Sequence, residues 1–244
     1  MATYPPETVG LARSRSWLTD MATGIRIIND AGTTLIDETY SNLCLHTKGS
    51  LTLNAVAGTI HNVAGTWGDT AVVAVRSSGK VFATIQAGSI TIIGAASAVV
   101  TYYVFDVPTA PYSTYGLLIY NAAGDVVFDA LKKYARVAAI QTGTTAAAWD
   151  GTVAYPAGRT YAYAFLVAAY KNNTTWTHVG DPAGHEYRVD VDTQWASASI
   201  SGVTIDWQYG PVSHKEYINF AGGFGAYTTE KPKMTAAVVD VTGY

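Results

Sequence analysis

This sequence has little charge and almost no cysteine, and each shortage excludes a class of protein. Charged residues make up 14% of its 244 residues, against roughly 25% in ordinary soluble domains. The net charge is −3 and no basic block is present, so the electrostatic signature of a nucleic-acid-binding protein is missing. The single cysteine, Cys44, cannot form an internal disulfide, which fits folding in a reducing cytoplasm.

Long apolar runs and a leader pattern are also missing. The longest apolar-looking stretch, Ile90 to Val107, is interrupted by Gly94, Ser97 and Thr101. Its β-branched and aromatic residues predict two buried strands rather than a membrane span. The segment Met1 to Glu7 has neither a charged n-region nor an apolar h-region, so we expect no signal peptide.

Apolar and aromatic residues are abundant instead. Hydrophobic residues make up 49% and aromatic residues 12% of the chain, with 17 tyrosines. A surface poor in charge and rich in aromatic residues is typical of protein–protein contacts, whose buried centres are depleted in charge. Many β-proteins share this composition, but we favour the interpretation that the chain assembles, as a homo-oligomer and with other proteins.

A segment of 14 residues occurs twice, 92 residues apart. Gly24–Asp37 matches Gly116–Asp129 at six identical positions, and four more positions exchange one hydrophobic residue for another. An internal repeat is stronger evidence of architecture than a single motif. Each copy has two β-rich runs separated by Asn-x-Ala-Gly, which predicts a hairpin.

The shared residues have physical roles in such a hairpin. Asn29 and Asn121 can cap the turn by bonding their own backbone two residues on. Gly32 and Gly124 fall where a hairpin turn with a glycine bulge needs a positive φ.

Asp37 and Asp129 end the second strand of each copy. We expect them to bond backbone amides at the following bend. A pair of catalytic carboxylates is the alternative, but each Asp has an equally good turn role.

The fold class that we predict is all-β, with two tandem antiparallel β-sandwich-like domains built on the duplicated hairpin unit. Residues 1–21 form an extended arm, 22–107 the first domain, 108–114 a linker with two prolines, and 115–244 the second domain. Strands are expected at Ala71–Arg76, Val81–Gln86, Ile90–Ile93, Ala98–Asp106, Tyr161–Tyr170, Glu186–Val191, Ser199–Tyr209, Glu216–Phe220 and Met234–Val241. The best helical window is Asp129–Ala139, where the repeat favours strand.

The second copy opens with Tyr115-Gly116-Leu117, and a basic segment, Lys132 to Val137, follows its hairpin. This pattern, over residues 115–140, resembles one found in tail and baseplate proteins of long-tailed bacteriophages. The first copy is a weaker match, because it opens with Thr23-Gly24-Ile25 and continues with Ser41 to Leu45 instead of a basic strand.

The resemblance implies a structural role in the virion, at the tail tip, baseplate or fibre attachment, after synthesis in the host cytoplasm. Its implied partners are other tail proteins and further copies of the chain, as a trimer or hexamer. It carries no catalytic residues.

Candidate chemical sites are weak. His178 and His185 flank Asp181 and precede Glu186, but their spacing fits no standard metal site. No nucleophile elbow is present, and Gly222–Gly225 lacks the Lys-Ser/Thr ending of a phosphate loop. We therefore expect no enzyme activity, no cofactor and no metal.

Asp190 and Asp192 alternate with Val189 and Val191. Two carboxylates on one strand face can bind calcium or serve a glycosidase. The favoured interpretation is the solvent face of an amphipathic strand, and a polysaccharide-cleaving enzyme is the third hypothesis.

Four aromatic residues gather in the second half of the chain: Trp176, Trp195, Trp207 and Tyr209. Exposed aromatic faces would suit a receptor- or glycan-binding module that contacts a host polysaccharide, which is the alternative function. Packing in the core or in an interface is the favoured explanation, because large rings dominate both.

Overall fold

The structure is a computed structural model. It describes residues 27–28, 34–36, 42–86, 88–143, 151–178, 187–220, 227–231 and 233–244. Every regular element in these ranges is a strand, and every strand pair is antiparallel. The predicted all-β class is thus confirmed. No helix among these residues is long and apolar enough to span a membrane.

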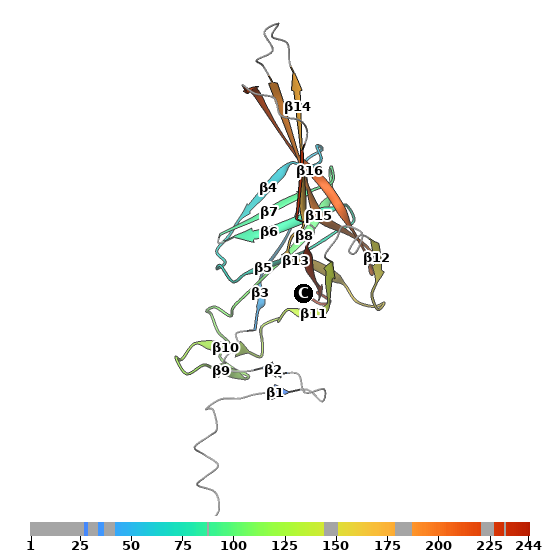
Figure 1. Cartoon of the computed structure of the whole chain (residues 1–244). Coiled ribbons are helices and arrows are strands. Elements are labelled where there is room, and N and C mark those ends of the chain that lie inside the picture. The colour runs from blue at the N-terminus through green and yellow to red at the C-terminus, as the bar shows by residue number, and fades with distance from the viewer. Residues whose placement is uncertain are drawn as a thin grey trace, which may run out of the picture.

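Among the described residues, eighteen strands follow one another (Figure 1). The first eight are β1 (Ile27–Ile28), β2 (Thr34–Ile36), β3 (Cys44–Thr52), β4 (Ile60–Ala64), β5 (Val72–Ser77), β6 (Val81–Gln86), β7 (Ser89–Gly94) and β8 (Val99–Asp106). The other ten are β9 (Leu118–Tyr120), β10 (Val126–Asp129), β11 (Arg136–Gly143), β12 (Gly151–Ala154), β13 (Tyr161–Val167), β14 (Tyr170–His178), β15 (Tyr187–Ser201), β16 (Thr204–Phe220), β17 (Tyr227–Lys231) and β18 (Met234–Asp240).

Several predicted strand boundaries differ from the structure. The expected strand 161–170 is interrupted, because β13 ends at Val167 and β14 begins at Tyr170. The expected strand 199–209 is also divided, because β15 ends at Ser201 and β16 begins at Thr204, and β16 then runs through Gly210 and Pro211 to include the expected strand 216–220. A register shift in the pairing of β15 with β16 at this point accommodates the proline without ending the strand, as bulges do.

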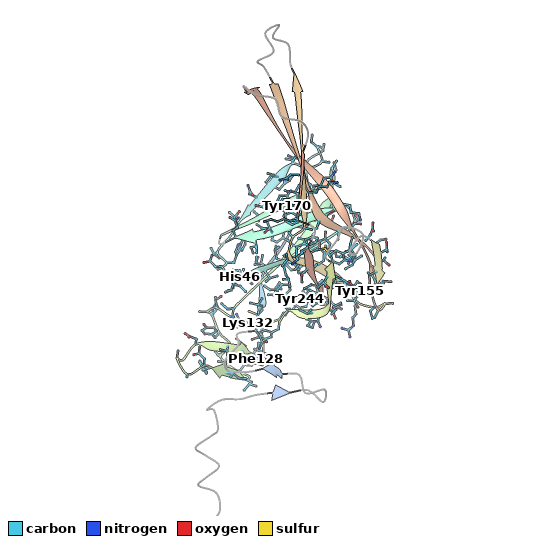
Figure 2. The ribbon with its side chains drawn as sticks, viewed as in Figure 1. His46, Phe128, Lys132, Tyr155, Tyr170 and Tyr244 are labelled. Carbon is cyan, nitrogen blue, oxygen red and sulfur yellow. The ribbon has the colours of Figure 1, made fainter. Side chains whose placement is uncertain are left out.

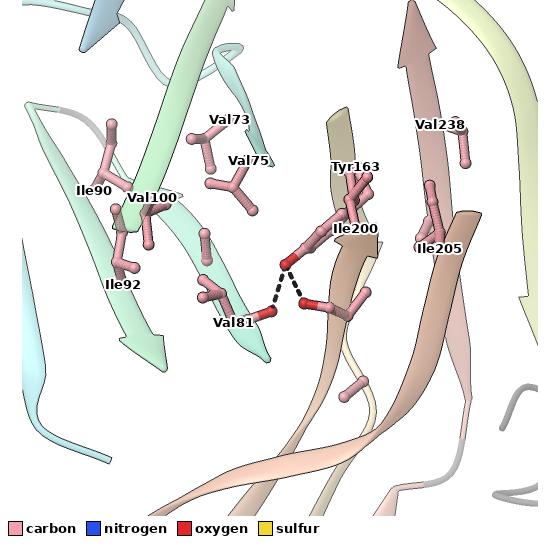
Figure 3. Close-up of a cluster of buried hydrophobic side chains, with 14 of the residues drawn as sticks. Val73, Val75, Val81, Ile90, Ile92, Val100, Tyr163, Ile200, Ile205 and Val238 are labelled. Carbon is pink, nitrogen blue, oxygen red and sulfur yellow. Dashed lines mark hydrogen bonds between the residues drawn. The ribbon is translucent and has the colours of Figure 1, made fainter. Parts of the chain in front are cut away.

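Two large sheets pack face to face. One has the order β11-β18-β13-β5-β8-β3 and the other β12-β16-β15-β6-β7-β4. The main core lies between them and contains Val75, Val100 and Tyr163 from the first sheet and Ile90 and Ile205 from the second (Figure 3). The inward residues of each strand alternate with outward ones, so period-two strands build a sandwich.

The strand order reveals that the chain is duplicated well beyond the repeated hairpin. In the first half, β3, β8 and β5 lie in one sheet, and β4, β7 and β6 lie in the other. In the second half, β11, β18 and β13 occupy the equivalent places in the first sheet, and β12, β16 and β15 do so in the second. Each sheet is therefore symmetric about its centre, where β5 meets β13 and β6 meets β15.

The pairing registers agree with this duplication. Ile27 pairs with Ile36 in β1–β2, as Ile119 pairs with Phe128 in β9–β10. These pairs are 92 residues apart, like the two copies of the sequence repeat. The two hairpins therefore have the same strand alignment.

The edge strand that follows each hairpin repeats the same irregularity. The register of β3 shifts between Leu45 and Thr47, and that of β11 shifts between Val137 and Ala139. These positions are again 92 residues apart. The hairpin and the bulged edge strand are thus both repeated at the same spacing.

The two halves share their sheets and their main core. Tyr163 is buried in β13, and its hydroxyl lies 2.9 Å from the Val81 carbonyl oxygen and 2.5 Å from that of Ala198 (Figure 3). Val81 and Ala198 form the register pair that joins the halves in the second sheet. The predicted linker 108–114 lies between β8 and β9, but the sheets continue across the division between the halves.

A second apolar cluster lies on the outer face of the six-stranded sheet. Ala74, Ala162 and Ala164 are fully or almost fully buried there. The segment before β11 crosses to β3, since Leu45 N donates to the Lys133 carbonyl at 2.6 Å. The two edges of this sheet are therefore joined at one end, and small side chains leave room for the close approach.

The second half also carries an extension. The outer parts of β15 and β16 pair with each other and, through β15, with β14 and β17, in the order β17-β14-β15-β16. This four-stranded sheet, which we call the projecting sheet, extends away from the body of the molecule (Figure 1).

Candidate assembly surface

The hairpin β9–β10 is shaped by a tight turn. The Asn121 Oδ1 atom accepts hydrogen bonds from Ala123 N at 3.0 Å and Asp125 N at 2.8 Å. Gly124 N donates to the Asn121 carbonyl at 3.0 Å, and Gly124 has a φ of 89°. Only glycine adopts this left-handed conformation at little cost. The turn is thus fixed by an asparagine that caps it and a glycine that closes it.

Asp129 ends the hairpin as a buried acceptor. Its carboxylate accepts hydrogen bonds from the Ser113 amide at 2.9 Å, from the Ser113 hydroxyl and from Leu131 N at 3.0 Å. Burial acts to raise the pKa of Asp129, but these hydrogen bonds and the charge of Lys132 lower it below its ordinary value. The carboxylate therefore stays ionised and holds the entry and exit of the hairpin together.

Tyr134 fixes the hairpin to the body of the molecule. Its hydroxyl donates to the Asp129 carbonyl at 3.0 Å, and its ring stacks on Phe128 with centroids 4.8 Å apart. Burial raises the pKa of Tyr134 to about 12. Tyr134 also forms a bridge with Cys44 at the start of β3. The hairpin is consequently a rigid projection rather than a free loop.

Large apolar side chains are exposed around this rigid hairpin. We call them the hairpin surface: Tyr112, Tyr115, Leu117, Tyr120 and Leu131, which are between 40% and 74% exposed. The hairpin lies at the end of the molecule opposite the projecting sheet, where Phe128 and Lys132 are labelled (Figure 2). Several large apolar side chains exposed around one hairpin are typical of a protein interaction site.

Turn geometry does not account for these exposed residues. Leu117 and Tyr120 form no part of the turn, yet their equivalents in the first copy, Ile25 and Ile28, are also large and apolar. Water penalises an exposed apolar side chain, and burial in a contact relieves that penalty. The arrangement fits the burial of the hairpin against another protein.

The other turn positions predicted from the sequence are Asn29, Gly32 and Asp37, and these lie outside the described residues. The equivalent residues of the second copy show what the hairpin needs at each position: a cap, a positive φ and a buried acceptor.

The aromatic candidates lie in different environments. Trp207 is only 2% exposed and packs edge-on against Tyr163 in the main core, so its ring is not available to a glycan. Trp195 stacks on Phe82 with centroids 4.8 Å apart. Trp176 and Tyr209 lie in β14 and β16, but their side chains are outside the described part. We find no common platform among those that are described.

The predicted polar candidates are also dispersed. His178 is the last residue of β14, whereas His185, Asp181 and Glu186 lie outside the described residues. Asp190 and Asp192 lie in β15, where they pair in register with β16 and β14. Within the ranges that the structure describes, no group of three or more His, Cys, Asp or Glu is placed to hold a metal ion.

Cys44 is buried. Desolvation raises the pKa of its thiol. A buried thiol with a raised pKa has little thiolate and is unreactive.

Sequence reasoning missed a charged cluster at the end of β18. The Asp240 carboxylate is buried and accepts a hydrogen bond from Thr242 N at 2.9 Å. It also forms ion pairs with Arg159 and Arg136. Burial opposes ionisation, but these partners lower the pKa of Asp240 to about 2. The only sequence signal was the basic segment at residues 132–137, which contains Arg136 but gives no hint of its distant partner.

Comparisons of the chain with family models, curated proteins and solved structures found no match.

Proposed function

We propose that this chain is a structural protein of a bacteriophage virion, at the tail tip, baseplate or fibre attachment, and that it acts by assembling with other tail proteins. The observation that carries the proposal is the hairpin β9–β10. It combines the sequence pattern that resembles phage tail proteins with a rigid, apolar surface. The same strand alignment occurs in β1–β2, so the unit is used twice.

The mechanism is geometric rather than chemical. The buried Asp129 carboxylate and the stacked Tyr134 hold the hairpin in one orientation before it meets a partner. Preorganisation lowers the entropic cost of association. The exposed rings of Tyr115 and Tyr120 then supply apolar area at the centre of the contact, as aromatic residues do in interfaces.

The test is complementation of a phage that lacks the gene. The double variant Tyr120→Asp with Leu117→Asp places charge on the hairpin surface. Ala122→Asp is the control, because Ala122 is exposed in the turn and Asp is a favoured turn residue. We expect antibody against the chain to label the tail tip of complemented particles, the double variant to be absent from particles, and the control to be incorporated.

Particles that are complete and infectious without the chain would contradict the proposal. So would normal incorporation of the double variant, because the hairpin surface would then have no part in assembly.

A receptor- or glycan-binding module is the second candidate. It is favoured by one observation, that Trp176 lies in β14 of the projecting sheet, away from the body. The test is binding of the purified chain to cell-surface polysaccharides. Binding that is lost in Trp176→Ala and kept in Trp207→Phe would support this candidate over the assembly role.

A further inference from the structure

The six-stranded sheet of the body has two long edges. Its edge strands are β3 and β11, which have nine and eight residues. The edge strands of the other large sheet, β4 and β12, have only five and four residues. A long edge presents a row of unpaired backbone N–H and C=O groups to which a further strand can bind, and a very short edge presents few. The edges at β3 and β11 are therefore the ones whose residues decide whether another strand can pair there.

Strand β3 has a charge in its middle. Lys48 is the central residue of this strand. Its Nζ atom lies 5.4 Å from the centre of the Tyr103 ring and donates to the Tyr244 carbonyl at 3.1 Å, so the charge is held on the outer face of the sheet. Lysine on an edge strand discourages pairing with another chain, and β3 is protected in this way.

Strand β11 has an apolar residue at the equivalent position. Ile140 comes 92 residues after Lys48, the spacing of the repeat. Lys48 pairs with Tyr103 and Ile140 with Ala237, and both partners belong to the outer apolar cluster, so the two residues are on the same face. Ile140 is 52% exposed, and no residue from Val137 to Gly143 is charged. The edge at β11 therefore lacks the protection that β3 has.

The bulge does not account for this difference. A bulge twists an edge strand and hinders pairing, but β3 and β11 have their register shifts at equivalent positions. The segment 133–135 before β11 contacts β3, whereas β11 itself pairs only with β18 among the described residues. It lies on the body, away from the projecting sheet (Figure 1). An apolar, uncharged edge strand of this length is suited to receive a further strand.

We propose that β11 pairs with β11 of a second copy of this chain, antiparallel and about a two-fold axis at Ile140. The six-stranded sheets of the two copies then form one continuous sheet. An antiparallel pair forms about one backbone hydrogen bond for each pair of facing residues, so the segment Val137–Gly143 supplies roughly seven. The exposed Ile140 side chains meet at the centre and are removed from water, which is favourable.

The residue at the two-fold axis distinguishes the two edges. Pairing of two β11 strands places Ile140 opposite its own copy, and apolar cross-strand pairs are favourable. The same pairing of two β3 strands is centred on Lys48 and places two like charges opposite each other, which is destabilising. Only one edge of each sheet is thus suited to self-pairing. The contact therefore closes as a symmetric pair and does not continue into a fibre.

The sheet already contains a junction of the same kind. Its two halves meet where β5 and β13, equivalent strands of the duplicated fold, pair antiparallel through Val75 and Tyr163. A pair of β11 strands extends the sheet by the same arrangement. Charge does not oppose it, because Arg136 precedes the uncharged segment, and the Arg136 residues of the two copies lie roughly 25 Å apart at about 3.3 Å per residue. That separation exceeds the distance over which salt screens exposed charges.

The inference goes beyond the proposed function, because β11 is not part of the hairpin surface and self-pairing does not depend on the virion assignment. Failure of self-pairing would contradict this inference alone. Absence of the chain from particles would contradict the proposed function alone.

The test is the native mass of the full chain by light scattering after size exclusion, over a wide range of concentration. We expect an even multiple of the 25.9 kDa of one chain. Ile140→Lys gives β11 the residue that β3 has at the equivalent position and is expected to halve the mass. Ile60→Lys is the matched control, because Ile60 is also 52% exposed and lies on the edge strand β4. It is expected to leave the mass unchanged.

A disulfide experiment keeps the inference testable if the lysine variant does not fold. In a Cys44→Ala background, Ile140→Cys is compared with Ile60→Cys under mild oxidation. Facing residues of an antiparallel pair have Cα atoms about 4.5–5.5 Å apart, which a disulfide can span. We expect Ile140→Cys alone to link two chains. An odd multiple of the chain mass, one chain included, would overturn the inference. So would an unchanged mass in Ile140→Lys, an equal loss of mass in Ile60→Lys, or equal disulfide formation by both cysteines.

Discussion

The two halves of the molecule have the same framework and differ in how they connect it. In the first half, β5 passes to β6 through Ser78–Lys80, and β7 passes to β8 through Ala95–Ala98. These two turns touch, since Ala95 N donates to the Lys80 carbonyl at 2.8 Å. In the second half, the same two connections are lengthened into the strands of the projecting sheet. The difference teaches that the framework accepts large additions at its turns, while the sandwich is kept.

The ends of the last strands differ in a second way. Asp106 ends β8 and accepts hydrogen bonds from neutral groups, Gly68 N at 2.7 Å and the Thr70 hydroxyl at 3.0 Å. Asp240 ends β18 and is held by two arginines. Equivalent positions of the duplicated fold thus keep a buried carboxylate but satisfy it differently. The following predictions test how far the halves depend on one another, from the largest expected effect to the smallest.

Core truncation in either half should destabilise the whole molecule. Ile92 and Trp207 are each the fourth residue of their strand, in β7 and β16, and both are buried. We expect Trp207→Ala to cost about 3–5 kcal/mol and Ile92→Ala about 2–5 kcal/mol of unfolding free energy. Calorimetry should show one transition in each variant. Two separate transitions would mean that the halves fold independently, despite their shared core.

Tyr163→Phe tests the junction between the halves. The substitution keeps the ring but removes the hydroxyl that bonds to the backbone of β6 and β15. Two buried carbonyls lose a donor, so we expect a loss of about 1–3 kcal/mol. Urea unfolding measures it, and Tyr161→Phe is the control, because the Tyr161 hydroxyl reaches the Pro156 carbonyl within its own half. An equal loss of unfolding free energy in both variants would show that the hydrogen bonds at the junction contribute no more than a hydrogen bond within one half.

Acid should weaken the second half through Asp240. The folded-state pKa is about 2, below the ordinary 3.8, so ionised Asp240 stabilises the fold. That contribution is complete above the unfolded pKa and is lost as the pH falls from about 4 to about 2. Asp240→Asn should therefore flatten the decline of the unfolding free energy in this window, as measured by urea midpoints at successive pH values. A decline as steep as that of the wild type would contradict the prediction.

The smallest effect is expected at the hairpin turns. Gly124→Ala forces alanine into a positive φ and should cost about 1 kcal/mol. Gly32→Ala is the matched change in the first copy, and the shared strand alignment of the two hairpins leads us to expect the same loss. Thermal unfolding of both variants measures it. A neutral Gly32→Ala would show that only the strand alignment, and not the turn, is repeated.

The sequence was sufficient to predict the all-β class and the location of the repeat. Turn positions are visible because a positive φ at Gly124, or a cap such as Asn121, allows few residue types. The rest of the duplication was not visible, because any apolar residue of suitable size fills a core position, as Ile92 and Trp207 show. The two copies of the fold therefore need not share residue types at core positions, where only packing restricts the side chain.

The candidate surfaces were predictable only in part. A period-two pattern does not tell whether a tryptophan is on the buried or the exposed face of its strand. The sequence therefore grouped Trp207 with Trp176, although Trp207 lies in the core. Asp240 and Arg159 lie 81 residues apart in the chain, and no local pattern connects them. The exposure of Tyr115 and Leu131 follows from tertiary packing, which a hydrophobic pattern does not reveal.

The adjacency of the two short turns in the first half has a practical consequence. Because the second half carries its four-stranded sheet at the equivalent pair of connections, the site between Ser78–Lys80 and Ala95–Ala98 is a natural place to graft an additional module. A chain with residues 168–194 and 211–233 transplanted to those turns would display two such sheets on one sandwich. The duplicated framework can thus serve as a scaffold, and the number of sheets that it displays depends on how many of its turns are lengthened.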